Sequence, residues 1–252
     1  MEPLERAAPG RASPTAPAAC PVDMVLVKGG RLVLLERGAD VEVSSYCLDR
    51  HEVKASSFRA AAEAEPKLRD CAGEAGCSPL PSRTDWGDPG EDARSSRWCS
   101  GAREGAGEQP VVCVSLEEAR GYCRARGARL PSGDEWEWAA RGAGRRTPWG
   151  ASLAQGGEAC WSKPRPRPGP CPVGAHPGDR TPEGVVDLGG NASEWVEPPA
   201  RAKDTKGRWA YGASWYAIDD GYFGAALGGF ETPARRAETI GFRCAASATS
   251  AR

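Results

Sequence analysis

The sequence predicts a single, loop-rich domain in which short strands and a few helices are stapled by disulfides. Glycine and proline account for 32 and 22 of the 252 residues, and both favour tight turns over long regular elements. Hydrophobic residues make up 40% of the chain and nine residues are tryptophan, a composition that excludes a wholly disordered protein. With no internal repeat and no linker after residue 21, we expect a disordered tail over 1–20, one domain over 21–247 and a short tail over 248–252.

The cysteines are the second observation that predicts this architecture. They are Cys20, Cys47, Cys71, Cys77, Cys99, Cys113, Cys123, Cys160, Cys171 and Cys244. An even, scattered set without Cys-x-x-Cys pairs favours a disulfide framework over a metal cluster. It predicts an oxidising, extracytoplasmic compartment, although residues 1–20 lack the apolar core of a secretion signal. Either the start is truncated or misassigned, or the signal was removed; lipid anchoring at Cys20 is a weaker alternative.

The charge balance excludes some classes of partner. The formal net charge is −1, which predicts neither nucleic acid nor an anionic membrane as a partner. No stretch is apolar for long enough to span a membrane. We expect a monomer.

Local patterns in the first half of the chain predict its strands and first helix. Residues 22–35 contain two apolar runs around Gly-Gly, a hairpin pattern, and residues 41–48 predict another strand. Residues 56–64 predict a helix with a serine N-cap. The polar, Gly- and Pro-rich stretch from about 66 to 110 predicts a long loop that its cysteines hold in place.

Two helices have clear start and stop signals. Ser115-Leu-Glu-Glu118 is a capping box with Gly127 as its stop. Ser132-Gly-Asp-Glu135 is a second capping box with Gly142 as its stop. Beyond this point the chain is mostly short runs between glycines and prolines, and residues 163–172 predict a stiff, extended loop.

Several segments occur in an order and spacing that resemble one family. They are Met24–Gly30, Cys47–Val53, Gly127–Gly142, Pro148–Gly150, Asp187–Trp195, Gly212–Trp215 and Gly241–Cys244. Together they resemble the formylglycine-generating enzyme (sulfatase-modifying factor) family along residues 22–246. The resemblance implies a single α+β domain with little regular secondary structure, related to the C-type lectin fold.

The resemblance also implies a calcium site in the loop 187–194. Its ligands are the carboxylates of Asp187 and Glu194 and the main-chain carbonyls of Gly190 and Ala192. Calcium accepts such mixed cages of hard oxygen ligands. The alternative is that Asp187 and Glu194 only cap turns. A second calcium site of the family is expected to be absent, because Ala159 replaces its asparagine ligand.

The family's catalytic chemistry is not expected in this chain. Active relatives use oxygen and copper(I) held by two cysteines to convert a cysteine of a sulfatase peptide to formylglycine. Here Ala217 and Tyr222 stand at these two positions, and neither side chain offers the soft sulfur ligand that copper(I) selects. His51 and His176 are too few and too distant to build the multi-histidine iron site of other relatives. We therefore expect neither copper nor catalysis.

The resemblance also supports one disulfide, Cys123–Cys244. For the others our suggested pairing is Cys20–Cys47, Cys71–Cys77, Cys99–Cys113 and Cys160–Cys171, although ten cysteines permit hundreds of connectivities. We expect all ten to be bridged.

Three functions remain open. The first is a binding or scaffold module for a peptide, protein or glycan, because the segment after Gly212 lines the peptide groove of active relatives. The candidate ligand-binding residues are Trp215, Tyr216, Asp219, Asp220, Tyr222, Phe223 and Phe230, although we expect about half of the aromatic ones to fill the core. The second is a diverged oxidoreductase acting on protein cysteine, with Arg235, Arg236 and Glu238 as polar groups of its cleft. The third is a structural accessory.

Overall fold

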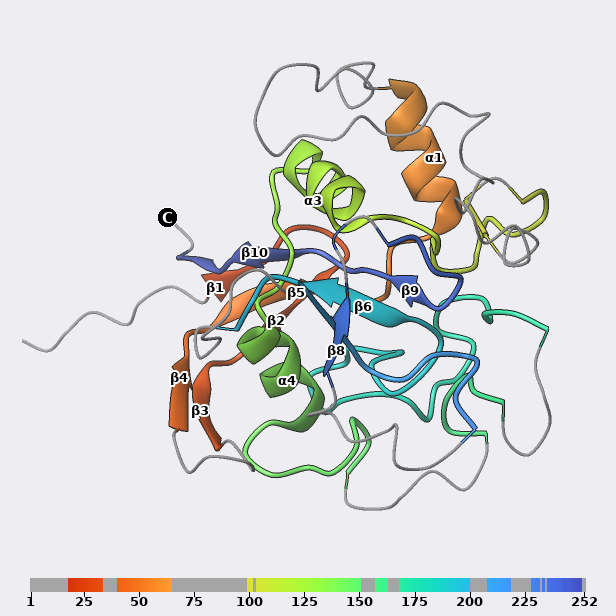
Figure 1. Ribbon diagram of the computed structural model, residues 1–252. Coiled ribbons are helices and arrows are strands. Elements are labelled where there is room, and N and C mark those ends of the chain that lie inside the picture. The colour runs from red at the N-terminus through yellow and green to blue at the C-terminus, as the bar shows by residue number, and fades with distance from the viewer. Residues whose placement is uncertain are drawn as a thin grey trace, which may run out of the picture.

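The computed structural model describes residues 18–33, 40–64, 99–101, 103–150, 157–162, 168–199, 208–218, 228–231, 233 and 235–250. The helices are α1 (Ala55–Ala64), α3 (Leu116–Ala125) and α4 (Gly133–Arg141). The strands are β1 (Ala18–Ala19), β2 (Met24–Val27), β3 (Gly30–Val33), β4 (Asp40–Val43), β5 (Tyr46–Asp49), β6 (Ser193–Val196), β7 (Arg208–Tyr211), β8 (Gly228–Glu231), β9 (Ile240–Gly241), β10 (Ala245–Ser247) and β11 (Thr249–Ser250). All of these elements are short, as the frequency of glycine and proline predicts (Figure 1).

Small sheets form the centre of the molecule. One has the order β10-β5-β2 and another the order β8-β7-β6-β9, in which β6 and β9 run parallel. The two remaining sheets are the pairs β3-β4 and β1-β11. Because β9 and β10 bracket residues 242–244, the Gly-Phe-Arg-Cys motif connects the two larger sheets.

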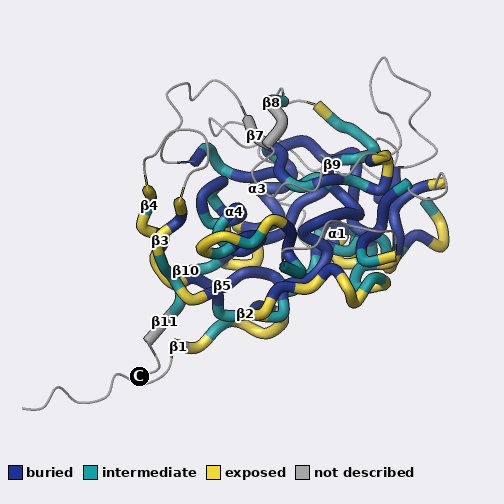
Figure 2. Tube along the Cα trace, turned by 90° about the horizontal axis from the view of Figure 1, so that it is seen from below, coloured by how far each residue is buried: buried dark blue, intermediate teal, exposed yellow. Residues whose placement is uncertain are grey.

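Helices lie on both sides of these strands. Figure 1 shows α1 and α3 on one side and α4 on the other. On the first side the rings of Phe58 and Tyr122 stack at 5.6 Å between centroids, and Phe242 meets Tyr122 edge-on at 5.5 Å. On the second side Trp136 packs against Tyr211 at 5.6 Å. Figure 2 shows that the chain is buried through the middle of the molecule and exposed near β1, β3 and β4.

Both predicted capping boxes are present. The side chain of Ser115 accepts from the backbone N–H of Glu118, whose carboxylate accepts from the backbone N–H of Ser115. Ser132 and Glu135 repeat this arrangement at the start of α4. Gly142 follows α4 with a φ of 51°, a conformation that glycine adopts at little cost. Helix α1 begins at Ala55, so Ser56 lies inside the helix, its hydroxyl donates to the carbonyl of Gly107, and the predicted serine N-cap is wrong.

The predicted hairpin over residues 22–35 is wrong. Strand β2 pairs with β5 and strand β3 pairs with β4, so the two runs belong to different sheets. The glycines between them serve close packing: a Cβ on Gly29 would lie 2.3 Å from the carbonyl oxygen of Val43, and one on Gly30 would lie 2.5 Å from the ring of Trp138. The single strand predicted over 41–48 is likewise divided into β4 and β5.

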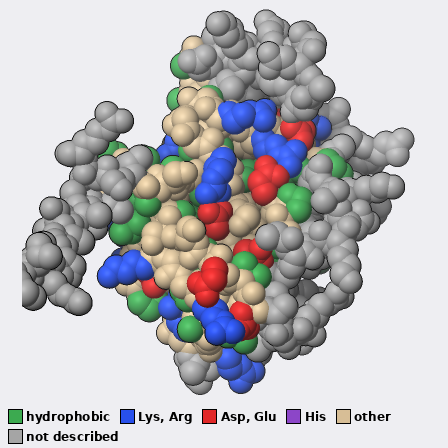
Figure 3. Space-filling view, turned by 90° about the vertical axis from the view of Figure 1, so that its left-hand side faces the viewer, with side chains coloured by type: hydrophobic (Ala, Val, Ile, Leu, Met, Phe, Trp, Pro, Cys, Tyr) green, Lys and Arg blue, Asp and Glu red, His purple; other side chains and the backbone are tan. Residues whose placement is uncertain are grey.

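The two ends of the domain pair with each other. Ala18 faces Ser250 and Ala19 faces Thr249 in the antiparallel pair β1-β11. Regular pairing therefore extends slightly beyond the expected domain limits of 21 and 247. Figure 3 shows acidic and basic side chains side by side on one face of the described chain. Within the described residues, no helix has the length and hydrophobicity needed to cross a bilayer.

Candidate functional site

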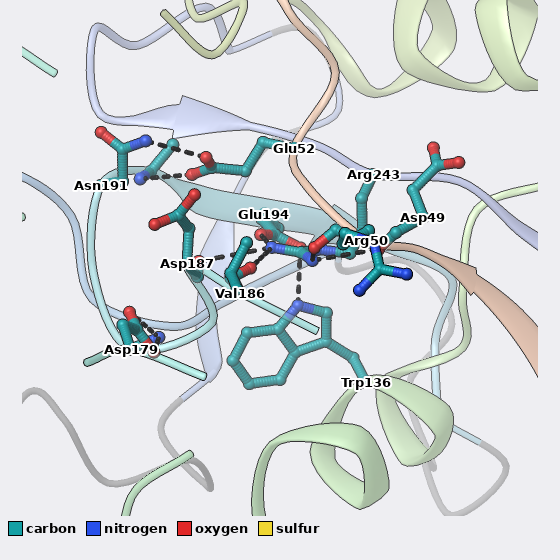
Figure 4. Close-up of polar contacts among 12 residues, drawn as sticks. Asp49, Arg50, Glu52, Trp136, Asp179, Val186, Asp187, Asn191, Glu194 and Arg243 are labelled. Atoms are coloured by element: carbon teal, nitrogen blue, oxygen red, sulfur yellow. Dashed lines mark hydrogen bonds and ion pairs between the residues drawn. The ribbon is translucent and has the colours of Figure 1, made fainter. Parts of the chain in front are cut away.

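A buried guanidinium organises the centre of the molecule. Arg243 is 0% exposed and lies between Phe242 and Cys244, just after β9. Its Nε and Nη2 donate to the two carboxylate oxygens of Glu194 at 2.7 and 2.6 Å. Its remaining hydrogen bonds, at 2.9–3.3 Å, end on the main-chain carbonyls of Asp49, Arg50, Val186 and Asp187. Arg243 thereby joins three segments that are far apart in the sequence (Figure 4).

Four buried carboxylates surround this arginine. The first, Glu194, also accepts a hydrogen bond from the indole nitrogen of Trp136 at 2.7 Å. The others lie in the same layer of polar side chains (Figure 4). We call the set the Arg243 network; its members are Glu52, Asp179, Asp187, Glu194 and Arg243, and none is more than 2% exposed.

Each of the other three carboxylates accepts a hydrogen bond from a loop residue. Glu52 accepts from the side-chain amide of Asn191 at 2.8 Å and from the backbone N–H of Ala192 at 3.0 Å. Asp179 accepts from the backbone N–H of Gly189 at 2.8 Å. Asp187 accepts from the backbone N–H of Gly174 at 2.5 Å. The turn 187–192 is therefore fixed by hydrogen bonds to Glu52 and Asp179 and by the bond from Gly174 to Asp187.

The network holds more carboxyl groups than basic groups. Burial raises the pKa of the Asp187 carboxyl to about 6, and the charge of Glu194 adds to the effect. Burial, together with the charge of Asp187, raises the pKa values of Glu52 and Asp179 well above their usual range. Four buried carboxyl groups thus lie around a single guanidinium, and burial favours their protonated forms, whereas a bound cation would favour the charged forms.

The residues expected to bind calcium suit a hard cation in their chemistry. Asp187 and Glu194 supply carboxylates to the network, and the Oε1 of Glu194 accepts a single hydrogen bond, from Arg243, which leaves it further acceptor capacity. No described residue donates a hydrogen bond to the carbonyl of Gly190. Asp187 and Asn191 have φ values of 59° and 68°, which bend the loop tightly. The oxygen donors, the surplus of carboxyl groups and the bent backbone fit calcium.

The segment Ser214–Ile218, which we call the rim, alternates between the core and the solvent. Trp215 and Ala217 are 2% and 9% exposed, whereas Tyr216 and Ile218 are 65% and 70% exposed. The indole of Trp215 donates to the carbonyl of Glu238 at 2.9 Å, and its backbone N–H donates to the carbonyl of Asn191 at 2.8 Å. This burial corrects the expectation that Trp215 is displayed to a ligand: it anchors the rim.

The other expected ligand-binding residues have different outcomes. Tyr216 is displayed on the rim. Asp219, Asp220, Tyr222 and Phe223 lie outside the described residues, and for Phe230 only the backbone, in β8, is described.

The position of the first copper-binding cysteine is occupied by a buried methyl group. Ala217 packs in an apolar cluster with Ala159, Trp161 and Ala213, so no sulfur ligand stands at this point. Tyr222, at the second position, lies outside the described residues. Arg236 forms an ion pair with the buried Glu118 at 2.7 Å and Arg235 pairs with Glu231 at 3.1 Å.

The two histidines lie near one stretch of chain. A Cβ on Gly174 would lie 3.0 Å from the Cε1 of His51, and His176 is two residues further on. Burial, followed by the charge of Arg243, lowers the pKa of His51 to about 4. His51 also lines a polar cavity of about 450 Å³ with Asp49, Arg50, Lys54 and Arg126.

The described cysteines form four disulfides. They are Cys20–Cys47, Cys99–Cys113, Cys123–Cys244 and Cys160–Cys171. These are four of the five pairs expected from the sequence; Cys71 and Cys77 lie outside the described residues. Disulfides of this number are typical of an oxidising compartment.

Comparison with known proteins establishes the family. Residues 11–248 match the sulfatase-modifying factor enzyme 1-like domain. The chain belongs to this family. Among curated relatives, the inactive C-alpha-formylglycine-generating enzyme 2 of Bos taurus is 38% identical over 165 residues, which cover 59% of this chain and 54% of the relative. The formylglycine-generating enzyme of Streptomyces coelicolor is 47% identical over 73 residues, or 26% of this chain and 23% of the relative.

This member of the sulfatase-modifying factor family spans about half the length of the mammalian relative that it matches. Among solved structures, PvdO from Pseudomonas aeruginosa superposes with a TM-score of 0.65 at 20% identity, covering 94% of this chain and all of that one. Treponema denticola variable protein 1 superposes with a TM-score of 0.62 at 17% identity, covering 89% and 94%. These likenesses confirm the predicted formylglycine-generating enzyme-like α+β fold.

Sequence reasoning missed three members of the Arg243 network. Glu52 and Arg243 lie inside the segments that carry the family resemblance, but neither was assigned a role, and Asp179 lies outside those segments. A signal was available for Arg243, which stands between Phe242 and Cys244 just before a strand. An arginine so placed is either exposed or paired with a buried acid.

Proposed function

We propose that this domain is a non-catalytic, extracytoplasmic binding module that presents the rim to a peptide, protein or glycan. The observation that carries the proposal is the exposure of Tyr216 and Ile218, at 65% and 70%, on a segment whose intervening residues are buried. Exposed aromatic and aliphatic side chains on a rigid support are typical binding anchors. The name of the mammalian relatives, which includes the word inactive, agrees with a role other than catalysis.

The rigidity of the rim supports this proposal. Both carbonyls flanking Tyr216 accept hydrogen bonds from one residue, since the Ser162 hydroxyl donates to Trp215 at 2.8 Å and the Ser162 N–H donates to Ala217 at 2.9 Å. A segment held in this way loses little conformational entropy when it binds.

Array binding tests the proposal. Wild type, Tyr216→Ala and Ile218→Ser are applied to peptide and glycan arrays, with Val22→Ser as the matched control because Val22 is 85% exposed and lies outside the rim. We expect each rim variant to weaken the strongest binding at least about fivefold, roughly 1 kcal/mol, and the control to leave it unchanged. Equal binding by all four proteins would refute a binding role for the rim, and no binding at all would favour the structural accessory.

Calcium is the second part of the proposal. Asp187, Gly190, Ala192 and Glu194 would hold the ion, which would neutralise the network and stiffen the loop behind the rim. At a concentration about 100 times its Kd, calcium should stabilise the fold by about 2.7 kcal/mol, seen as a higher Tm in calorimetry. Asp187→Ala should abolish this shift, because it removes the side-chain ligand oxygens, whereas Asp40→Ala, which alters an acid paired with the exposed Arg31, should keep it. A wild-type Tm that calcium does not move would refute this part.

A diverged oxidoreductase acting on protein cysteine is the second candidate. The observation that favours it is the 47% identity to the Streptomyces enzyme over 73 residues. Oxygen consumption with a cysteine peptide after loading with copper(I) measures this activity. We expect none, and no stoichiometric copper, because Ala217 offers no thiolate. Formation of an aldehyde on the peptide would replace the binding module with this candidate.

A further inference from the structure

Two cysteines and a histidine meet beside the loop 187–194. The donor atoms of Cys160, Cys171 and His176 all lie within 4.8 Å of one another. Cys160 and Cys171 are bonded to each other, and they are 1% and 8% exposed. Neither cysteine belongs to the pair that active relatives use for copper, because those positions correspond to Ala217 and Tyr222.

The three residues are held in place by contacts other than the disulfide. The backbone N–H of Asn191 donates to the carbonyl of Cys160 at 2.8 Å. The side-chain oxygen of the same Asn191 accepts from the backbone N–H of Cys171 at 2.9 Å. Asn191 is 0% exposed and is itself fixed by Glu52. Breaking the sulfur–sulfur bond therefore leaves both cysteine backbones hydrogen-bonded to one buried residue, Asn191.

The ring of His176 is oriented for ligation. Its Nδ1 lies 3.0 Å from the carbonyl oxygen of Gly157, which can only accept, so Nδ1 carries the proton. In the neutral ring the lone pair is then on Nε2, which faces the Sγ of Cys171 at 3.5 Å. A carbonyl on the far nitrogen is the usual second partner of a metal-binding histidine.

The separation of Cys171 from His176 matches that of a zinc site. A thiolate at about 2.3 Å and an imidazole at about 2.0–2.1 Å from a tetrahedral zinc ion lie about 3.6 Å apart, close to the 3.5 Å between Cys171 and His176. Two thiolates on one zinc ion lie about 3.8 Å apart, a separation that side-chain rotation can provide once the disulfide is open. The fourth position of the ion is left to water or an added ligand.

We propose that Cys160, Cys171 and His176 form a redox-gated site for a divalent cation of the zinc class. In the oxidised protein the sulfurs are bonded to each other and bind no metal. A dithiol reductant supplies two electrons and two protons, the Cys160–Cys171 bond breaks into two thiols, and the reductant closes to its own disulfide. The cation then displaces one proton from each thiol and accepts the lone pair of the His176 Nε2.

Cobalt(II) is the probe, because its bonds to thiolate sulfur produce a near-ultraviolet charge-transfer absorption. The full chain is treated with increasing amounts of a phosphine reductant, and the released thiols are located by alkylation and mass spectrometry. We expect the absorption to appear in step with release of the Cys160 and Cys171 thiols and to saturate at one cobalt per chain. The oxidised protein should show none, and zinc should displace the cobalt.

Matched variants separate this site from other thiols. His176→Ala should weaken cobalt binding more than about tenfold, whereas His51→Gln, which changes the only other histidine, should leave it unchanged. Cys160→Ser combined with Cys171→Ser retains every other cysteine and should lose the absorption. Circular dichroism confirms that each protein is folded.

Four results would overturn the proposal. They are no absorption when both thiols are shown to be released, equal affinity in wild type and His176→Ala, equal absorption in the double serine variant, and a disulfide that opens only as the circular dichroism signal of the fold is lost.

Discussion

Asn191 links the Arg243 network to the rim, since it bonds both Glu52 and Trp215, yet the two are built in opposite ways. In the network, charged side chains are at most 2% exposed and are satisfied by one another and by backbone groups. In the rim, alternate side chains are exposed and the anchoring comes from Trp215 and from main-chain hydrogen bonds. A change in the network should therefore alter stability first, whereas a change at an exposed rim position should alter binding alone.

The largest effect is expected from removing the central charge of the network. Arg243→Met leaves Glu194 buried without its guanidinium, and the loss of one partner from a buried ion pair costs about 3–5 kcal/mol. Urea denaturation should show a loss of this size. Arg235→Met is the control, because its ion pair with Glu231 is largely exposed and should contribute less than about 1 kcal/mol. Equal effects of the two substitutions would show that the buried ion pair of the network contributes no more than an exposed one.

A smaller effect is expected at Gly190, where the loop 187–194 passes close to Cys160. A Cβ on Gly190 would lie 2.7 Å from the carbonyl oxygen of Cys160, so Gly190→Ala forces backbone atoms apart and should cost about 1–3 kcal/mol. Gly144→Ala, where an added Cβ meets nothing within 4 Å, should change stability by less than about 0.5 kcal/mol. A thermal melt of each variant measures the contrast, and a harmless Gly190→Ala would show that the loop is looser than the structure indicates.

Two adjacent rim residues should also differ in their contribution to stability, with the buried Trp215 contributing more than the exposed Tyr216. Trp215→Phe removes the donor to the Glu238 carbonyl and part of a buried ring, with an expected cost of about 1–2 kcal/mol. Tyr216→Phe, at an exposed position, should change the unfolding free energy by less than about 0.5 kcal/mol. Chemical denaturation of both variants measures the two losses of unfolding free energy. A larger loss from Tyr216→Phe than from Trp215→Phe would show that Trp215 is not the residue that anchors the rim.

The last effect appears only on acidification, as a pH dependence at the edge of the network. Burial, then Arg243, lowers the pKa of His51 from 6.5 to about 4 in the folded protein, so the unfolded chain binds this proton first as the pH falls. The stability associated with neutral His51 is therefore present above pH 6.5 and is lost progressively down to about pH 4. Relative to His51→Gln, wild type should lose unfolding free energy over this window. If the unfolding free energies of wild type and His51→Gln change with pH in parallel, the lowered pKa of His51 is contradicted.

Local signals in the sequence predicted α3 and α4 correctly because each signal is complete within a few residues. Ser115 and Glu118, like Ser132 and Glu135, are three residues apart and satisfy each other's backbone whatever surrounds them. The hairpin failed for the opposite reason. The two apolar runs flanking Gly29 and Gly30 carry no information about which strand they pair with, and their partners, β4 and β5, are decided by packing against Trp138 and the core.

The sequence by itself determined the family, the α+β class, both capping boxes and the absence of sulfur at position 217. Each of these follows from the identity and spacing of residues along the chain. Only the tertiary structure decided that Trp215 is buried while Tyr216 is exposed, that Glu52 reaches Asn191 across 139 residues, and that His176 faces the Cys160–Cys171 pair. The physical reason is that burial and charge pairing depend on distances in space, and short-range patterns do not encode the long-range contacts that set those distances.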